Sequence, residues 1–501
     1  MKIDANMPCP SDRCGYTLTK ERGGRDDLDP VQEGTGPFEE TCCWRETWNE
    51  RNRCVWHAEV DDKNSQLLVD SRSDYPERFD GVHLKGTILA NLISFEDCTI
   101  NYSDFSNCYL EGANFQNSWV VGSNFENSKA SYLLFSDSDF IRCDFSGCHM
   151  QIVSGPRSYL GECDFDKATI DGDLRHSDIW HCDFTGSEKS LVDLTGARVL
   201  GCDFSESLLF DWKWIFVDGA HNEFTDCTIS DFEVLCSSLK FSTFDESEIN
   251  KCEFRLTDIE NSDFNDCAMF DCSFIEPDLY GCSFQNTKVD RYTAFEHYYV
   301  RTDRPAIDIE KFVQLNRLWR SEVANRGGES DTRLIEKRIW THQALQEMFA
   351  ANSLSSKARD AYLSRKNDQL DYIAHHRKWL DTNWYILNAS KYIVGFGEKP
   401  SYVVIWSVVV VLLFPLFYMA GGGVTGLDLV LNLNQGSNLP VETVSDYLLN
   451  LYFSGLTFST VGYGDVSPAT WSVRFFATIE SFFGALLTAL LVFVLGRRTT
   501  W

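Results

Sequence analysis

The sequence is poor in basic residues: 45 lysines and arginines stand against 74 aspartates and glutamates, and the formal net charge is −29. A protein that binds phosphate groups needs the opposite balance, so nucleic acid is not expected as a direct partner. The first 60 residues also lack an apolar run, and no signal peptide is predicted. We therefore expect the N-terminus to stay in the cytoplasm, where the 18 cysteines are reduced thiols or metal ligands.

Two long apolar runs occur near the C-terminus, Tyr402–Ala420 and Trp471–Leu495. The first has 19 residues, which as a helix measures about 30 Å, the thickness of a bilayer core. The segment between the runs has no lysine or arginine, whereas Lys391 and Lys399 precede the first run and Arg497-Arg498 follow the second. This asymmetry predicts two spans of the cytoplasmic membrane, with both termini cytoplasmic and the intervening loop outside.

Phenylalanine recurs every 20 residues in the middle of the chain, with a single step of 19. The series is Phe105, Phe125, Phe145, Phe165, Phe184, Phe204, Phe224, Phe244, Phe264 and Phe284. Within this period an apolar residue occupies almost every fifth position, which fits neither a helix nor a plain strand. It fits a square solenoid with four short sides per coil, and about ten coils at ~4.8 Å give a rod of ~50 Å.

Twelve of the 18 cysteines lie two residues before a central apolar position of this pattern. They are Cys98, Cys108, Cys143, Cys148, Cys163, Cys182, Cys202, Cys227, Cys252, Cys267, Cys272 and Cys282. Because Ala113 and Ser123 occupy equivalent places, these cysteines are predicted to be small core residues rather than metal ligands. Residues 79–290, with phrases such as Ala113-Asn114-Phe115-Gln116-Asn117, resemble the pentapeptide-repeat family, which implies a right-handed quadrilateral β-helix.

Residues 291–400 lose the five-residue pattern and are predicted to form a helical connector. Apolar spacing indicates helices over 309–323, 331–351 and about 356–380. The stretch Trp384–Leu387 is predicted to begin an interfacial helix that lies on the inner leaflet.

The external loop contains a second apolar stretch, Asp446–Phe458, which is too short to span and predicts a re-entrant helix. Thr460-Val461-Gly462-Tyr463-Gly464-Asp465 comes after it. A dehydrated K⁺ needs rings of oxygen atoms in place of water, and four copies of these backbone carbonyls can supply them. The Thr460 hydroxyl can add the innermost ring.

The residues of this hexapeptide have separate expected roles. Gly462 and Gly464 allow the backbone conformations that turn successive carbonyls toward one axis. Val461 and Tyr463 point away and brace the filter, and Asp465 attracts cations or anchors the loop at the outer mouth.

Residues 402–498 resemble the two-transmembrane potassium channels, in the filter hexapeptide and in Tyr452-Phe453-Ser454 before it. The resemblance implies an all-α pore domain with a re-entrant loop, a homotetramer in the lipid bilayer and passive transport of K⁺ bound in the filter. In the second span, Gly484 is either a gate hinge or a close helix contact. Glu480 is expected to brace the pore helix rather than line the conduction path.

The N-terminal region holds five candidate ligands for a structural Zn²⁺ outside the repeat pattern: Cys14, Cys42, Cys43, Cys54 and His57. Cys54-x2-His57 has ligand spacing, and Cys14 with Cys42 or Cys43 completes a tetrahedral set. The surrounding sequence resembles small zinc-binding modules that precede some pentapeptide arrays. A partly disordered cap with reduced thiols is the alternative.

We thus expect four regions: a zinc module (1–62), a β-helix (79–290), a helical connector (291–400) and a pore domain (401–501). No membrane helix carries regularly spaced arginines, so control is expected to come from the N-terminal side, through a cytoplasmic protein or ligand. A rival hypothesis is a membrane-tethered scaffold, since acidic pentapeptide rods are known as mimics of the DNA duplex. Catalysis is not expected, because no nucleophile–base set or cofactor motif stands apart from these patterns.

Overall fold

The computed structural model describes residues 12–18, 41–72, 77–296, 331–376, 382–426 and 441–498. The chain divides into two compact units, residues 1–330 and 331–501. The predicted helix over 309–323 lies outside the described residues.

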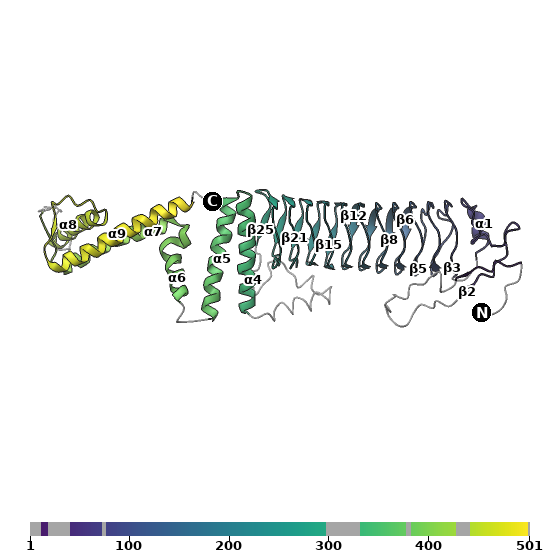
Figure 1. The fold of residues 1–501 in the computed structure, drawn as a ribbon, viewed down its shortest axis with the longest axis horizontal. Helices are drawn as coiled ribbons and strands as arrows, with labels where there is room; N and C mark the ends of the chain where they lie inside the picture. The colour runs from purple at the N-terminus through teal and green to yellow at the C-terminus, as the bar shows by residue number, and fades with distance from the viewer. Residues whose placement is uncertain are drawn as a thin grey trace. The chain divides into compact units, whose positions relative to one another are not determined.

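The first unit is a β-solenoid of about eleven coils across residues 78–296 (Figure 1). One side of the coil is a nine-stranded parallel sheet. Its strands are β3 (Arg78–Asp80), β4 (Thr99–Asn101), β5 (Trp119–Val121), β7 (Asp139–Ile141), β9 (Tyr159–Gly161), β11 (Asp178–Trp180), β13 (Arg198–Leu200), β16 (Asp218–Ala220) and β19 (Ser238–Lys240).

Two further sides belong to a 14-stranded parallel sheet. Its longer strands cross the corner between these sides: β6 (Lys129–Leu134), β8 (His149–Ser154), β10 (Thr169–Asp173) and β12 (Glu188–Asp193). Beyond β12 one ladder continues as β14 (Leu208–Phe210), β17 (Thr228–Ser230), β20 (Glu248–Asn250), β22 (Ala268–Phe270) and β24 (Lys288–Val289). The other continues as β15 (Lys213–Ile215), β18 (Glu233–Leu235), β21 (Glu253–Arg255), β23 (Ser273–Ile275) and β25 (Ala294–Glu296).

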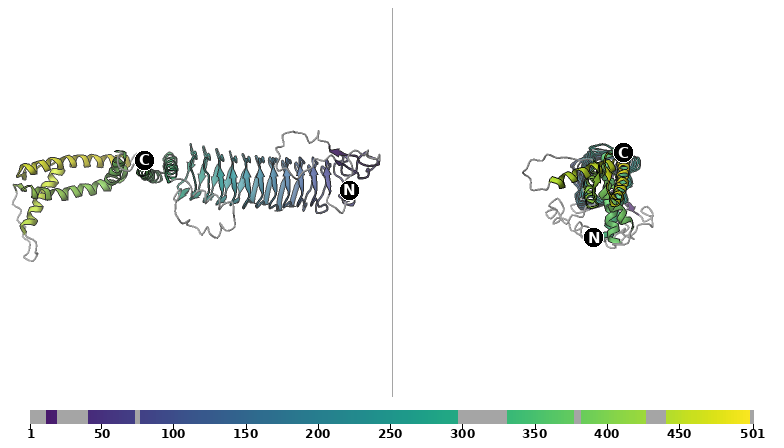
Figure 2. Two further views of the ribbon diagram at one scale, coloured as in Figure 1. Left: turned by 90° about the horizontal axis from the view of Figure 1, so that it is seen from below. Right: turned by 90° about the vertical axis from the view of Figure 1, so that its left-hand side faces the viewer.

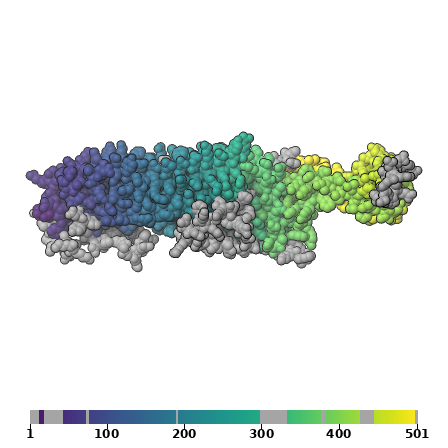
Figure 3. Space-filling model, turned by 180° about the vertical axis from the view of Figure 1, so that it is seen from behind, coloured from purple at the N-terminus to yellow at the C-terminus, as the bar shows by residue number. Residues whose placement is uncertain are grey.

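The fourth side consists of single bridges between successive coils, such as Asp144 to Asp164 and Asp183 to Asp203. Four columns at five-residue spacing confirm the predicted four-sided coil, whose surface forms a continuous rod (Figure 3). The predicted 19-residue step is present, since Asp164 pairs with Asp183. The spacing returns to 20 residues at a register shift in the pairing of β10 with β12. Ile170 pairs with Lys189, whereas Gly172 pairs with Val192.

The predicted phenylalanine column fills the interior. Phe204, Phe224 and Phe244 stack with ring centroids 4.9 and 4.7 Å apart and are buried. All twelve repeat cysteines are buried as well. The thiols of Cys108 and Cys227 donate to carbonyl groups of the preceding coil, and burial raises the pKa of Cys108 to about 12. The repeat cysteines are therefore small core residues, as predicted.

A small N-terminal segment covers the first coil. It contains the two-stranded pair β1 (Thr17–Leu18) and β2 (Thr41–Cys42) and the helix α1 (Ser65–Asp70). The Trp56 ring lies 4.7 Å from the ring of Phe79, so this segment extends the hydrophobic core of the solenoid.

The second unit is helical. Its elements are α4 (Asp331–Ala351), α5 (Ser355–His376), α6 (Thr382–Val394), the short 3₁₀ turn η1 (Gly395–Gly397), α7 (Pro400–Ala420), α8 (Val441–Phe458) and α9 (Trp471–Arg498). A two-stranded pair, β26 (Val424–Thr425) with β27 (Ser467–Pro468), joins the segments after α7 and before α9. The helices expected over 331–351 and about 356–380 are confirmed as α4 and α5. They are joined by a buried contact of 2.7 Å between His342 Nδ1 and an Asp368 carboxylate oxygen.

Candidate functional site

Helices α7 and α9 are both long and apolar enough to cross a membrane. They run side by side in opposite directions (Figure 2). At one end Val403 packs with Val494, and at the other the Thr470 hydroxyl donates to the Gly421 carbonyl over 2.6 Å. The two predicted spans are thus found as paired helices.

Helix α8 leads directly into the predicted filter. Its bounds exceed the expected Asp446–Phe458 by five residues at the start, because the helix continues into a polar first turn. Phe453 packs with Phe414 of α7 and Val473 of α9, so α8 is held against both long helices.

The backbone of the predicted filter alternates in conformation. Thr460, Gly462 and Gly464 have φ angles of 55°, 55° and 81°, whereas Val461 and Tyr463 between them do not have positive φ. An added Cβ on Gly462 or Gly464 would have no neighbour within 4 Å in the subunit, so these glycines serve backbone conformation rather than space. All residues from Thr460 to Asp465 are exposed in the single subunit.

Asp465 is anchored by Tyr452, for which no separate role was predicted. The Tyr452 hydroxyl of α8 donates to an Asp465 carboxylate oxygen over 2.8 Å. Of the two tasks expected for Asp465, the geometry therefore provides for anchoring the loop to the pore helix.

Glu480 lies at the junction of three helices and is fully buried. Its carboxylate accepts from the Tyr418 hydroxyl of α7 and from the Ser454 hydroxyl of α8, which is shared with the Val411 carbonyl at 2.9 Å. Tyr418 and Ser454 were not predicted as its partners, although the Ser454 position comes directly after Tyr452-Phe453 in the motif. Gly484, one turn further along α9, lies against the Phe458 backbone at the end of α8.

The C-terminal end of α9 is tied to its own subunit through Arg497. The Arg497 guanidinium lies 3.1 Å from the buried Glu398 carboxylate and stacks 4.7 Å from the Tyr362 ring of α5. The Tyr362 hydroxyl donates to the Phe396 carbonyl over 3.2 Å, in a turn where Phe396 has a φ of 57°. We call Tyr362, Phe396, Glu398 and Arg497 the clasp. The sequence predicted only a topological role for Arg497.

Four of the five predicted metal ligands meet in the N-terminal segment. The thiols of Cys14, Cys43 and Cys54 and the His57 ring lie with their ligand atoms within 4.8 Å of one another. Cys43 Sγ lies 3.8 Å from Cys54 Sγ, and His57 Nδ1 lies 3.3 and 3.2 Å from the sulfurs of Cys14 and Cys54. Zn–S bonds of ~2.3 Å at a tetrahedral angle place two sulfurs ~3.8 Å apart, so the set fits a zinc ion.

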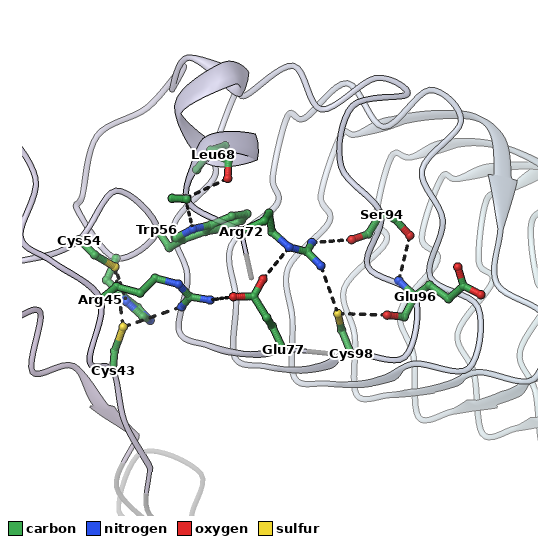
Figure 4. A network of polar contacts seen from close by, with 12 residues as sticks. Cys43, Arg45, Cys54, Trp56, Leu68, Arg72, Glu77, Ser94, Glu96 and Cys98 are labelled. Atoms are coloured by element: carbon green, nitrogen blue, oxygen red, sulfur yellow. Dashed lines mark hydrogen bonds and ion pairs between the residues drawn. The ribbon is translucent and has the colours of Figure 1, made fainter. Parts of the chain in front are cut away.

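The surroundings of this cluster also suit a metal. His57 Nε2 donates to the Asp80 carbonyl over 2.7 Å, which leaves Nδ1 directed at the thiols. Hydrogen bonds from Cys43 and Cys54 hold the pKa of the Cys14 thiol well below its usual range, which favours a thiolate ligand. Arg45 lies between Cys43 and Glu77 (Figure 4).

Of the two open alternatives, Cys43 lies in the cluster. Cys42 lies in β2, and its side chain is outside the described part of the structure.

Comparison with known families agrees with both parts of the fold. The family model described as "Ion channel" matches residues 403–500. A model described as "Pentapeptide repeats" matches eight copies, in stretches at 78–117, 93–127 and 121–151. The comparison with curated proteins found no match.

Solved structures similar to the chain include those of HetL and QnrB1. HetL, a pentapeptide repeat protein involved in heterocyst differentiation regulation from the cyanobacterium Nostoc sp. strain PCC 7120, is 14% identical, with 44% of this chain and 88% of HetL covered and a TM-score of 0.20. QnrB1, a plasmid-mediated fluoroquinolone resistance protein, is 18% identical, with 44% and 93% covered and a TM-score of 0.18. At such TM-scores neither likeness says anything about the function of this chain. The chain therefore carries an ion-channel domain over residues 403–500 together with a solenoid of pentapeptide repeats.

Proposed function

We propose that the protein is a potassium-selective channel that lets K⁺ cross the cytoplasmic membrane passively. The observation that carries this proposal is the alternating backbone of Thr460, Gly462 and Gly464 within the ion-channel domain. Alternation of this kind turns successive carbonyls to the same side, where they replace the water shell of a dehydrated K⁺.

Four copies form the pore. One subunit leaves its filter exposed, with Tyr463 74% accessible and Val461 50% accessible. Non-helical backbone at membrane depth is tolerated only where protein shields it or it lines a water-filled cavity. The brace that the sequence predicts for Val461 and Tyr463 therefore comes from neighbouring subunits of a homotetramer.

Both termini face the cytoplasm, in keeping with the basic residues that flank α7 and α9. Helix α6 lies at the inner leaflet, since Tyr385, Ile386 and Tyr392 are exposed on it and the Trp406 ring of α7 donates to the Tyr392 carbonyl over 2.9 Å.

The channel proposal is tested by ion flux into liposomes that contain the purified full chain. We expect K⁺ flux well above Na⁺ flux, and a tetramer by native mass spectrometry. Equal flux of the two ions, or flux from a monomer, would contradict the proposal.

The connector (residues 291–400) controls the pore, and the clasp is the contact between the connector and α9. The clasp is the place where α5 touches the end of α9, through Tyr362 and Arg497. A buried carboxylate such as Glu398 holds a cation firmly, because leaving that carboxylate without its partner is costly.

We predict that Arg497→Gln lowers the open probability at least about tenfold, the change that 1.4 kcal/mol would give. The freed end of α9 carries exposed apolar side chains such as Phe493, which become buried when the four inner ends meet at the pore axis. Single-channel recording in planar bilayers measures the effect, and the K⁺/Na⁺ permeability ratio should stay as in the wild type.

Arg498→Gln is the matched control, since it removes the same charge from the neighbouring residue. Equal open probabilities in both variants would show that the clasp has no part in gating.

We also propose that the N-terminal cluster binds a structural Zn²⁺ through Cys14, Cys43, Cys54 and His57. Support comes from the tetrahedral spacing of the ligand atoms and from the small apolar mass of this segment, which favours a metal staple.

A further inference from the structure

Three residues of α9 line up against the last turn of the pore helix α8. Glu480 accepts from Ser454, and the Ser481 hydroxyl donates to the Thr457 carbonyl over 3.3 Å. Gly484 comes one turn later, against Phe458. The contact therefore covers the end of α8 that leads into the filter, where the last carbonyls of a helix lack partners within it.

Gly484 is the closest of these contacts. A Cβ built on it would lie nearer to the Phe458 carbonyl oxygen than real Cβ atoms are found, and 2.9 Å from the carbonyl carbon. The obstacle is backbone, which cannot rotate away as a side chain can. Small residues permit such approach between membrane helices, where Cα–H···O contacts add to the packing.

The conformation of α9 supplies a second argument. The helix runs from Trp471 to Arg498 as one element, and Gly484 has no positive φ. What sets this glycine apart in the structure is the absence of a side chain toward α8. Gly496 on the same helix is the contrast, because a Cβ there would meet nothing within 4 Å.

We propose that Gly484 is a positioning residue for ion selectivity, which seats the end of α8 and thereby sets where the filter carbonyls lie. Ser481 and Glu480 hold the same seat by hydrogen bonds. This inference rests on the proposed K⁺-selective channel, and it develops the close-contact role that the sequence left open for Gly484.

Gly484→Ala tests the proposal in the full-length channel. The new methyl group forces the end of α8 away from α9. The filter carbonyls that follow α8 then move with it, and a shift of about 1 Å is enough to spoil the geometry of a binding site. We expect the K⁺/Na⁺ permeability ratio, measured from reversal potentials in planar bilayers, to fall at least about tenfold, as 1.4 kcal/mol would give. Gly496→Ala should keep the wild-type ratio.

A milder variant, Ser481→Ala, tests the seat even if Gly484→Ala does not assemble. Loss of one hydrogen bond worth ~0.5–1.5 kcal/mol should lower the ratio about two- to tenfold. A selective wild type with unchanged ratios in Gly484→Ala and Ser481→Ala, and with only the open probability altered, would overturn this inference alone. A wild type that passes K⁺ and Na⁺ equally would overturn the proposed function and this inference with it.

Discussion

Gly462→Ala is expected to abolish K⁺ flux while leaving the tetramer assembled. Gly462 has a φ of 55°, in the left-handed region that costs an L-residue about 1–2 kcal/mol. Four copies in one filter together cost about 4–8 kcal/mol against the conducting conformation. Because the carbonyls before and after this residue must face one axis, relief of that strain turns coordinating oxygens away from the ion. K⁺ uptake by liposomes that contain equal amounts of tetramer measures the loss.

Gly455→Ala is the control for adding a methyl group near the filter. Gly455 lies inside α8, and a Cβ there would meet no atom within 4 Å in the subunit. Alanine is also favoured over glycine in a helix interior by up to about 1 kcal/mol. This variant should conduct like the wild type. Equal flux from Gly462→Ala and the wild type would contradict the assignment of residues 460–465 as the filter.

The solenoid could be predicted from sequence because its physical constraint is local and repeated. Each of the four sides of a coil needs a large apolar side chain that points inward. The five-residue pattern and the phenylalanine column through Phe224 therefore appear directly in the sequence. Even the 19-residue step before Phe184 could be foreseen. Its accommodation at Gly172 could not, because a register shift depends on the neighbouring coil.

The hexapeptide proposed as the filter can likewise be recognised in the sequence, since its residues are consecutive and suit the coordination of K⁺, and its role as a filter stays a prediction. The partners of those residues could not be predicted. Glu480 bonds to Tyr418 and Ser454, which lie 62 and 26 residues earlier in the chain, and such pairs depend on how three helices pack. The apolar run Trp471–Leu495 places Glu480 in the predicted span, but it does not say which helix the Glu480 side chain faces.

The role of Gly484 could not be decided from the sequence either. A glycine in a membrane helix is equally suited to bending and to close contact, and the sequence left both open. Only the position of the Phe458 carbonyl favours contact. The clasp was missed because Glu398 and Tyr362 carry no pattern that links them to Arg497.

Choosing between Cys42 and Cys43 also required the fold. The two cysteines are adjacent in the chain, so ligand spacing alone suits either of them equally. The hairpin places Cys43 against Tyr16, through a 2.8 Å hydrogen bond from the Cys43 amide to the Tyr16 carbonyl, and its thiol within reach of Cys54.

Removal of the metal is expected to unfold the N-terminal segment while the solenoid remains intact. Structural Zn²⁺ contributes about 10–16 kcal/mol to small zinc modules, far more than the few apolar contacts of residues 41–72 can supply. The purified full chain should contain about one Zn²⁺, as a Cys₃His site requires. After exhaustive chelation we expect limited proteolysis to cleave within residues 41–72 and to spare the solenoid, whose backbone is paired on both sides of each coil.

Cys54→Ser should reproduce the effect of chelation without a chelator. Cys54 contacts both Cys43 and His57, so its loss removes the ligand that joins the two halves of the site. Cys108→Ser is the matched control: it also replaces a buried thiol, but at a repeat position whose equivalents hold serine. We expect zinc content, measured by plasma emission spectrometry, to fall to background in Cys54→Ser and to stay unchanged in Cys108→Ser. Equal zinc content in the two variants would exclude Cys54 as a ligand. A metal-free wild type with an ordered N-terminal segment would contradict the zinc proposal.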